Sequence, residues 1–408
     1  MNNSSKHVLL NGVILGNHSE LVNENRRALA SNDEALNYLT QKFSSQETIE
    51  REFQTIPTKR MSAGTSTSQY PENQARNRSR YILPYEDTRV MLHPNTRNPH
   101  GYINASNIQI PVAGRLFKYV ITQAPLSNTI DDFWQMVWES NARVIVMLSN
   151  RHEEKAKLND QPVYWPTQKK SKLNLRHFNI KLQNSTSNRF LTTSIMHIKP
   201  VSGGERRAIY HLHFSDFSTD SIAVPSSEDA FLGFIDAVNS VRRHVENERA
   251  HETNNGVLAN GKEKSSRSRS IGRTSLIDVT NRIRSQSVEN GGWRRKLTFS
   301  SNGQSSTSSH NSETSSSISS SNGSHHYRET NTDYFFPTIV HCVDGTSESG
   351  VYVLVEVLIH CFENNINVDI AKVLRTLRQQ RMHLIRNLHQ YRFVYSVIIN
   401  YLQKSRLI

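Results

Sequence analysis

Cysteine and long apolar runs are scarce in this 408-residue sequence. It contains only two cysteines, Cys342 and Cys361, which excludes a disulfide framework and is typical of a reducing compartment. No stretch approaches the ~20 apolar residues that cross a bilayer, the first residues lack a cationic-apolar-small leader pattern, and Asn2 excludes N-myristoylation. We therefore expect a soluble, cytoplasmic protein without a membrane span.

Length and charge place only loose bounds on function. The chain is long enough for one large domain with appendages or for two small domains. Its four tryptophans and 36% hydrophobic residues are adequate for a sizeable core. The net charge of +13 fits solubility or an acidic partner such as a phosphorylated protein, nucleic acid or lipid headgroups, and it discriminates poorly among them.

Changes of composition predict four regions. Residues 1–31 form a polar tail that we expect to be disordered, and residues 249–332 a disordered, basic, Ser-rich insertion. Such segments cannot bury enough apolar area to offset their ordering entropy. Residues 32–248 and 333–405 carry apolar periodicity, so we expect one folded domain in two parts, interrupted once.

Within the two folded parts, β-type runs alternate with helical periodicity. We expect strands at 115–122, 143–148, 209–214 and 334–341, and helices at 33–56, 129–138, 228–243, 350–362, 369–380 and 390–403. The alternation predicts an α/β (mixed α+β) fold with a mixed sheet.

The chemistry is concentrated in the segment IVHCVDGTSESG at 339–350. A buried strand leads into Cys342, a short loop and then a helix. Loop N–H groups and a helix N-terminus that converge on one point form an anion site and lower the pKa of a thiol. On these grounds alone the segment predicts a thiolate nucleophile beneath a phosphate.

This segment resembles the signature of the non-receptor-type protein tyrosine phosphatase family, His-Cys-five residues-Arg-Ser/Thr-Gly. The matching positions are His341, Cys342, Gly345, Ser349 and Gly350. Further family-like motifs follow in the expected order: RNR at 76–78, LPYEDTRV at 83–90, YINAS at 102–106, TQAPL at 122–126, DFWQMVW at 132–138, VYWP at 163–166 and QYRFVY at 390–395. The resemblance implies a single phosphatase-like domain with a central, mixed, highly twisted sheet flanked by helices.

The resemblance fails where the family binds phosphate. Glu348 occupies the position of the Arg that donates a bidentate pair of hydrogen bonds to the phosphoryl oxygens, and Asp344 adds a second acid. Like charges about 4 Å apart repel by ~4 kcal/mol at an effective dielectric constant of about 20. We expect very poor phosphate binding and a raised pKa for Cys342.

The remaining catalytic roles are also altered. The resemblance implies a Trp-Pro-Asp loop after the strand at 209–214, but the chain has FSTD at 217–220. Asp220 is therefore the displaced candidate for the general acid and Asp216 the second candidate, both out of register for proton donation.

Two further family positions differ. Ser79 replaces the Tyr that stacks on the substrate, and Arg386 replaces the Gln that positions water, with Asn387 in the place of its Thr neighbour. Only Cys342 keeps its residue type. We therefore predict a pseudophosphatase in which no catalytic residue is functional.

Other candidate residues have structural interpretations. We expect His341 to order the loop, Cys361 to pack as a small buried residue, and Trp134, Trp138 and Trp165 to lie in the core. His325 and His326 lie in the predicted insertion and have no visible partner for a metal site, so we predict neither a metal nor a cofactor.

The insertion has its own pattern of basic residues that precede hydroxyl side chains. It occurs at 267–270, 284–287 and 294–298. The segment is either a solvated spacer or a tether regulated by a kinase, since phosphate would neutralise the basic runs. Both interpretations stay open.

The leading functional hypothesis is a scaffold or regulator in phosphorylation signalling that binds a protein partner such as a protein kinase and has no small-molecule substrate. The alternatives are a phosphotyrosine reader without turnover and an unusual active phosphatase. Nucleic-acid binding by the insertion rests on charge alone, so we do not expect that partner. The chain also resembles the nematode pseudophosphatases that hold regulatory kinases at the egg cortex, which implies a kinase partner and a location at the cell cortex.

Overall fold

The structure, a computed structural model, describes residues 24–149, 162–218, 220, 222–258 and 336–405. Most of the predicted tail (1–31) and of the predicted insertion (249–332) lies outside the described residues, as do both histidines at 325 and 326.

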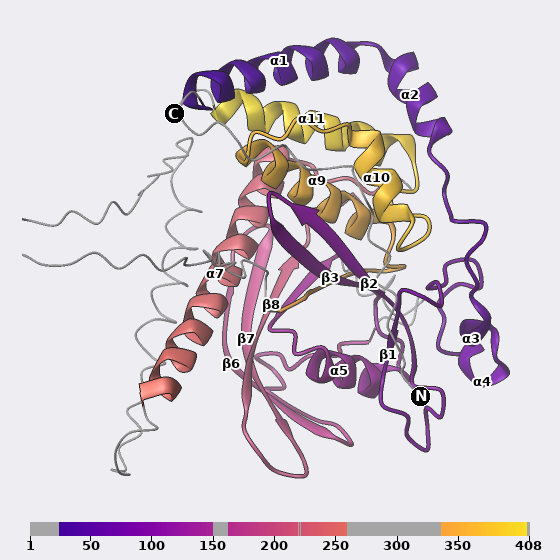
Figure 1. The fold of residues 1–408 in the computed structure, drawn as a ribbon. Helices are drawn as coiled ribbons and strands as arrows, with labels where there is room; N and C mark the ends of the chain where they lie inside the picture. The colour runs from indigo at the N-terminus through magenta and orange to yellow at the C-terminus, as the bar shows by residue number, and fades with distance from the viewer. Residues whose placement is uncertain (1–23, 150–161, 219, 221, 259–335, 406–408) are drawn as a thin grey trace, which may run out of the picture.

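A nine-stranded mixed sheet organises the described residues, with the strand order β1-β2-β3-β9-β4-β8-β7-β6-β5. The strands are β1 (Arg89–Met91), β2 (Tyr102–Val112), β3 (Arg115–Gln123), β4 (Val144–Leu148), β5 (Lys172–Asn174), β6 (Phe178–Ser187), β7 (Leu191–Pro200), β8 (Arg207–Phe214) and β9 (Thr338–Cys342). The central strands β3, β9, β4 and β8 are parallel, and the outer pairs are antiparallel. Figure 1 shows β2 and β3 running across the direction of β6 and β7, which is the twist expected of a large sheet.

Helices cover both faces of the sheet. They are α1 (Glu24–Ser44), α2 (Gln46–Thr55), α3 (Ser66–Gln69), α4 (Pro71–Gln74), α5 (Ile130–Glu139), α7 (Glu228–Leu258), α9 (Ser347–Glu363), α10 (Ile370–Arg378) and α11 (Leu388–Ser405). Residues of α7, α9 and α11 share one core with Tyr119 and Ile121 of β3, whereas α5 shares the other core with Val120. Alternate residues of a strand face opposite sides, so β3 contributes to both cores. The predicted α/β fold with a mixed sheet flanked by helices is confirmed.

The strand β9 fixes the position of the chemistry. All five of its residues are buried, and it pairs in parallel with β3 on one side and β4 on the other. A strand buried on both faces needs a continuous apolar sequence, which TIVHC largely supplies. Cys342 therefore lies at the carboxyl end of this central strand, just before α9 begins. In α/β proteins, ligand sites lie beyond the carboxyl ends of the parallel strands.

The structure differs from the sequence prediction at several boundaries. The strand expected at 334–341 is β9, which begins only at Thr338. The helix expected at 33–56 is divided at Ser45, whose hydroxyl accepts a hydrogen bond from Thr48 N (3.3 Å) and caps α2. The helix α1 begins at Glu24, inside the predicted tail, and α7 continues to Leu258, inside the predicted insertion. Polar residues can extend a helix that its packed turns have already nucleated, so apolar periodicity underestimates both lengths.

Candidate functional site

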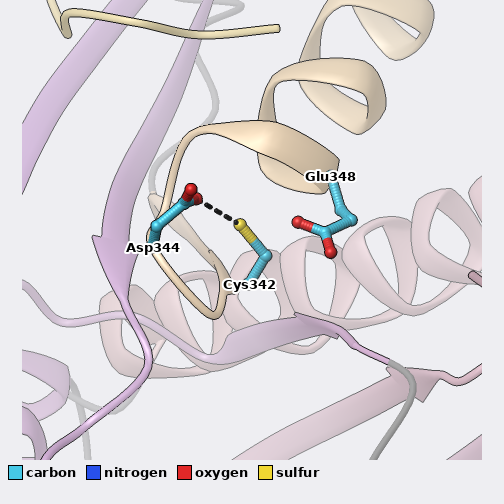
Figure 2. Close-up of side chains that lie close together, drawn as sticks. All are labelled: Cys342, Asp344 and Glu348. Carbon is cyan, nitrogen blue, oxygen red and sulfur yellow. Dashed lines mark hydrogen bonds between the residues drawn. The ribbon is translucent and has the colours of Figure 1, made fainter. Parts of the chain in front are cut away.

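The site lies in the loop that joins β9 to α9. Cys342 ends the strand, Asp344 stands in the loop, and Glu348 belongs to the first turn of α9. Figure 2 shows the two carboxyl groups on opposite sides of the Cys342 sulfur. The Cys342 thiol donates a hydrogen bond to Asp344 Oδ1 (3.4 Å), and the three side chains each offer an atom within 4.8 Å of the other two.

Two glycines let the loop backbone approach its neighbours closely. Gly345 has a φ of +71°, and a Cβ built on it would lie 2.4 Å from Thr122 O at the end of β3. Gly350 would place a Cβ 2.6 Å from Ile385 N. Neither position tolerates a side chain without a shift of backbone, so these glycines fix the shape of the loop.

A fully buried arginine holds the loop from beneath. Arg381 donates hydrogen bonds from Nε to Gly345 O (2.8 Å), from Nη2 to Asn104 Oδ1 (3.0 Å) and from Nη1 to Ser106 Oγ (3.2 Å). Burial lowers its pKa to about 10, so the guanidinium remains charged at neutral pH. The loop conformation is thus set by contacts on its inner side.

The Asp344 carboxylate binds backbone N–H groups at the start of α9. Its carboxylate accepts hydrogen bonds from Thr346 N (2.8 Å) and Ser347 N (3.2 Å), and from the Ser347 hydroxyl (3.2 Å). Arg386 Nη1 completes the arrangement with an ion pair to Asp344 Oδ2 at 2.9 Å. Burial alone would raise the pKa of Asp344, but these hydrogen bonds and the Arg386 charge lower it. The chain therefore binds its own carboxylate where the sequence predicts an external anion.

The Glu348 carboxyl group is not a permanent negative charge. Burial, reinforced by the charge of Asp344, raises its pKa to about 7. It is therefore close to half protonated at neutral pH, whereas the argument from sequence treated it as fully ionised. The difference arises from desolvation, which a sequence does not reveal.

The Cys342 sulfur is a thiol. The side chain is fully buried, and burial followed by the charges of Glu348 and Asp344 raises its pKa well above the usual range. The direction is the one that the sequence predicted, and desolvation is its larger cause. Because the thiolate is the nucleophilic form of cysteine, this environment suppresses attack by Cys342.

The acid-loop candidates bond within their own segment. The exposed Asp220 carboxylate accepts hydrogen bonds from the Ser218 hydroxyl (2.7 Å), Ile222 N (3.0 Å) and Ala223 N (3.4 Å). The Ser218 hydrogen bond is the main reason that the pKa of Asp220 is lowered. A lowered pKa favours the ionised form of Asp220, whereas a general acid acts from its protonated form. Asp216 accepts a hydrogen bond from the Ser226 hydroxyl (2.7 Å).

The same loop is fastened to the beginning of α11. Asn387 Nδ2 donates to Ile222 O (3.2 Å), and Gln390 Nε2 donates to Ala223 O (3.3 Å). These contacts follow directly after Arg386, which pairs with Asp344. The carbonyls of Ile222 and Ala223 thus connect this loop to the residues that follow Arg386.

At the predicted substrate wall the structure has a small polar side chain. The Ser79 hydroxyl accepts a hydrogen bond from Tyr81 N (3.1 Å). Tyr81 is 66% exposed, and the Arg80 guanidinium lies 4.7 Å from the centre of its ring. The neighbouring Arg78 donates hydrogen bonds to Ala124 O and Pro125 O, at 2.7 Å each, and so anchors this segment. The aromatic residue of the segment, Tyr81, lies two positions after Ser79.

His341 lies in a buried group of side chains next to the loop, and its role in ordering the loop stays a prediction. Its Nε2 lies 2.5 Å from the Tyr164 hydroxyl, which also contacts His211 Nε2 at 2.8 Å. Burial lowers the pKa of His341 to about 3 and that of His211 well below its ordinary value, so both rings are neutral. This buried group orients β9 immediately before Cys342.

The remaining candidates pack as predicted. Trp134 is fully buried, and Trp138 and Trp165 pack against the same core. Cys361 is buried in α9, and burial raises the pKa of its thiol to about 12.

Comparison with known proteins identifies the family. A family model described as protein-tyrosine phosphatase matches residues 73–258 and 305–400, which is more than half of the chain. The chain belongs to the protein-tyrosine phosphatase family. It is 31% identical to rat tyrosine-protein phosphatase non-receptor type 21 over 93% of its own length, and 30% identical to human non-receptor type 14 over 88%. Mouse non-receptor type 20 is 26% identical over 81% of the chain.

The chain spans only part of each of these phosphatases. It covers 25% of the rat type 21 protein, 23% of human type 14 and 55% of mouse type 20. Among the described residues of this family member, no helix is both long enough and apolar enough to cross a membrane.

The structure brings together some of the residues that the family signature singled out. Cys342 and Glu348 meet directly, and Arg386 reaches them through Asp344. Asp220 and Ser79 form hydrogen bonds within their own loops, with Ser218 and with Tyr81 N. Sequence reasoning missed Arg381 and the carboxylate-to-N–H contacts of Asp344. Arg381 follows α10 with no acidic residue nearby in sequence, so nothing in the sequence indicated its role. By contrast, an Asp two and three residues before the N–H groups at a helix start is a recognisable pattern of side-chain-to-backbone hydrogen bonding.

Proposed function

We propose that this member of the family is a pseudophosphatase, a catalytically inactive protein that acts as a scaffold or regulator in phosphorylation signalling. The observation that carries the proposal is the position of Asp344. Its carboxylate accepts hydrogen bonds from Thr346 N and Ser347 N. These two loop N–H groups, which could bind an external anion, are therefore already bound to an anion.

An incoming phosphate would have to displace that partner. Each hydrogen bond to a charged group contributes about 1.5–3 kcal/mol, and Asp344 also keeps its ion pair with Arg386. The phosphate would gain no bidentate guanidinium in exchange, because Glu348 stands at that position. The exchange is therefore unfavourable before any chemistry begins.

The two chemical steps are disabled independently of binding. Nucleophilic attack requires a thiolate, but Cys342 is held as a thiol by burial and by two acidic neighbours. Protonation of the leaving group requires a neutral acid, but the pKa of Asp220 is lowered. Restoring one of these groups would leave the other step without its catalyst.

A protein partner, in the cytoplasm or at the cell cortex, fits a chain that keeps the fold without the chemistry. The relatives are named as non-receptor tyrosine-protein phosphatases, which act on phosphorylated proteins by name, and we propose a role for this chain among such proteins. The resemblance to the egg-cortex pseudophosphatases favours a protein kinase as the partner. Co-purification of the intact chain, repeated with residues 249–332 removed, identifies the partner and shows whether the insertion is required.

Turnover of para-nitrophenyl phosphate tests inactivity. We expect the wild-type protein to release no more product than Cys342→Ser at any pH between 5 and 8, with an active phosphatase domain as the positive control. Turnover that Cys342→Ser abolishes would contradict the proposal.

One observation favours an alternative, a phosphotyrosine reader without turnover. The Arg386 side chain is 54% exposed and already places a guanidinium at the loop. Calorimetric titration with phosphotyrosine peptides separates the two functions: the scaffold proposal predicts no heat at millimolar peptide, and the reader predicts saturable heat that Arg386→Met removes.

A further inference from the structure

Three side chains of different chemistry converge at the loop and suit a cation. We propose that Cys342, Asp344 and Glu348 bind a divalent transition-metal ion, with zinc as the best match. The ligand atoms are the Cys342 sulfur and one carboxylate oxygen from each acid, which lie within 4.8 Å of one another. This inference goes beyond the scaffold function and does not depend on it.

The spacing fits a tetrahedral ion. Zinc binds sulfur at about 2.3 Å and carboxylate oxygen at about 2.0–2.2 Å, so two such ligands lie about 3.5 Å apart. The Cys342 sulfur lies 3.4 Å from Asp344 Oδ1, and Figure 2 shows Glu348 approaching the sulfur from the other side. The Glu348 oxygen lies within 4.8 Å of both other ligand atoms, so binding of an ion would draw it closer to them.

The proposed ion replaces one contact and leaves the others in place. It takes the position of the thiol proton in the Cys342-to-Asp344 hydrogen bond, and that proton is released to solvent on binding. Asp344 keeps its bonds to Thr346 N and Ser347 N, which orient the carboxylate as the outer partners of metal ligands do. The Asp344 side chain is 18% exposed, so the site is reachable from solvent.

A buried hydroxyl provides an independent indication of a ligand. The Ser349 side chain is 0% exposed, and its Oγ has no oxygen or nitrogen partner among the described residues, so that its polar neighbour is the Cys342 sulfur, a weak hydrogen-bonding group. A buried hydroxyl without a strong hydrogen-bond partner is unfavourable. A water on the fourth position of a zinc ion would give this hydroxyl a partner.

The ligand set discriminates among metals. Thiolate favours zinc, cobalt and related ions, whereas magnesium and calcium prefer six or more oxygen ligands. Three protein ligands leave a position for water, as in open zinc sites. We therefore expect zinc and cobalt, but not magnesium, to bind with one ion per chain.

The experiment titrates the full-length protein, freed of metal by a chelator, with zinc and with cobalt. Calorimetry should show one zinc site, and cobalt should give the near-ultraviolet band of thiolate-to-metal charge transfer. Cys342→Ser and the isosteric Glu348→Gln should each weaken zinc binding by at least about tenfold, since even outer partners of a metal contribute about 10–100-fold. The control is Cys361→Ser, which removes the other buried cysteine and should bind as wild type does.

The outcomes separate the site from binding by the 18 histidines of the chain. A charge-transfer band that is lost in Cys342→Ser and kept in Cys361→Ser supports the proposal. Zinc affinity that is unchanged in both Cys342→Ser and Glu348→Gln overturns it, as does cobalt binding without the band in the folded wild-type protein. Circular dichroism confirms that each variant is folded. The turnover assay has a separate readout, so either proposal can fail alone.

Discussion

The inner and outer sides of the loop after β9 differ sharply. On the inner side, Gly345, Gly350 and the buried Arg381 fix the backbone through close contacts and hydrogen bonds to neighbouring strands. On the outer side, Asp344 and Glu348 replace the chemistry of a phosphate site with carboxyl groups. The comparison teaches that contacts of buried residues hold the shape of this loop, while the side chains that face Cys342 determine its charge.

The largest expected effect distinguishes the buried Arg381 from the exposed Arg386, which both contact the loop. Arg381→Met leaves the acceptors Gly345 O, Asn104 Oδ1 and Ser106 Oγ unsatisfied in the interior. We expect the free energy of unfolding to fall by about 3 kcal/mol, since each unsatisfied buried group costs about 1–3 kcal/mol. Urea denaturation measures this loss.

The matched control is Arg386→Met. Its side chain is 54% exposed and its ion pair with Asp344 is solvent-screened, so we expect a loss below about 1 kcal/mol. Equal losses in the two variants would show that the loop is not held from its inner side.

The sequence predicted the strands and helices around the loop better than the protonation and the contacts of the loop's side chains. The apolar run before Cys342 and the paired motifs of the family predicted β9, α5 and the mixed sheet, because periodicity and burial decide these elements. The sequence also located the substitutions at Glu348 and Asp344. It could not predict that Glu348 is close to half protonated or that Arg381 lies beneath the loop, since both depend on burial created by segments distant in sequence.

The next effect concerns the buried histidines beneath the loop. The pKa of His341 is about 3 in the folded protein and about 6.5 in the unfolded chain, so the unfolded state binds more protons below pH 6.5. Stability that is present above pH 6.5 is therefore lost as the pH falls. We expect His341 to contribute about 2 kcal/mol to the loss between pH 7 and pH 5.

Urea denaturation at both pH values measures this contribution. His341→Gln should reduce the pH dependence by that amount. His93→Gln, at a side chain that is 89% exposed, should leave it unchanged. The same pH dependence in all three proteins would refute the buried neutral histidine.

A smaller effect tests the outer side. The charges of Glu348 and Asp344 raise the pKa of Cys342 in addition to burial. The double variant Asp344→Asn/Glu348→Gln should lower the pKa of Cys342 and so increase the rate at which iodoacetamide alkylates it, because the thiolate is the reactive form. Peptide mass spectrometry follows Cys342, with Cys361 as the internal control. An unchanged rate would mean that burial alone protects the thiol.

The most direct test of the central claim is a calorimetric titration with vanadate, a phosphate analogue. The wild-type protein should give no binding at millimolar vanadate, because its own Asp344 carboxylate occupies the loop N–H groups and Glu348 replaces the guanidinium. The double variant Asp344→Ala/Glu348→Arg should bind vanadate. Saturable binding of vanadate by the wild-type protein, lost in Cys342→Ser, would contradict the account.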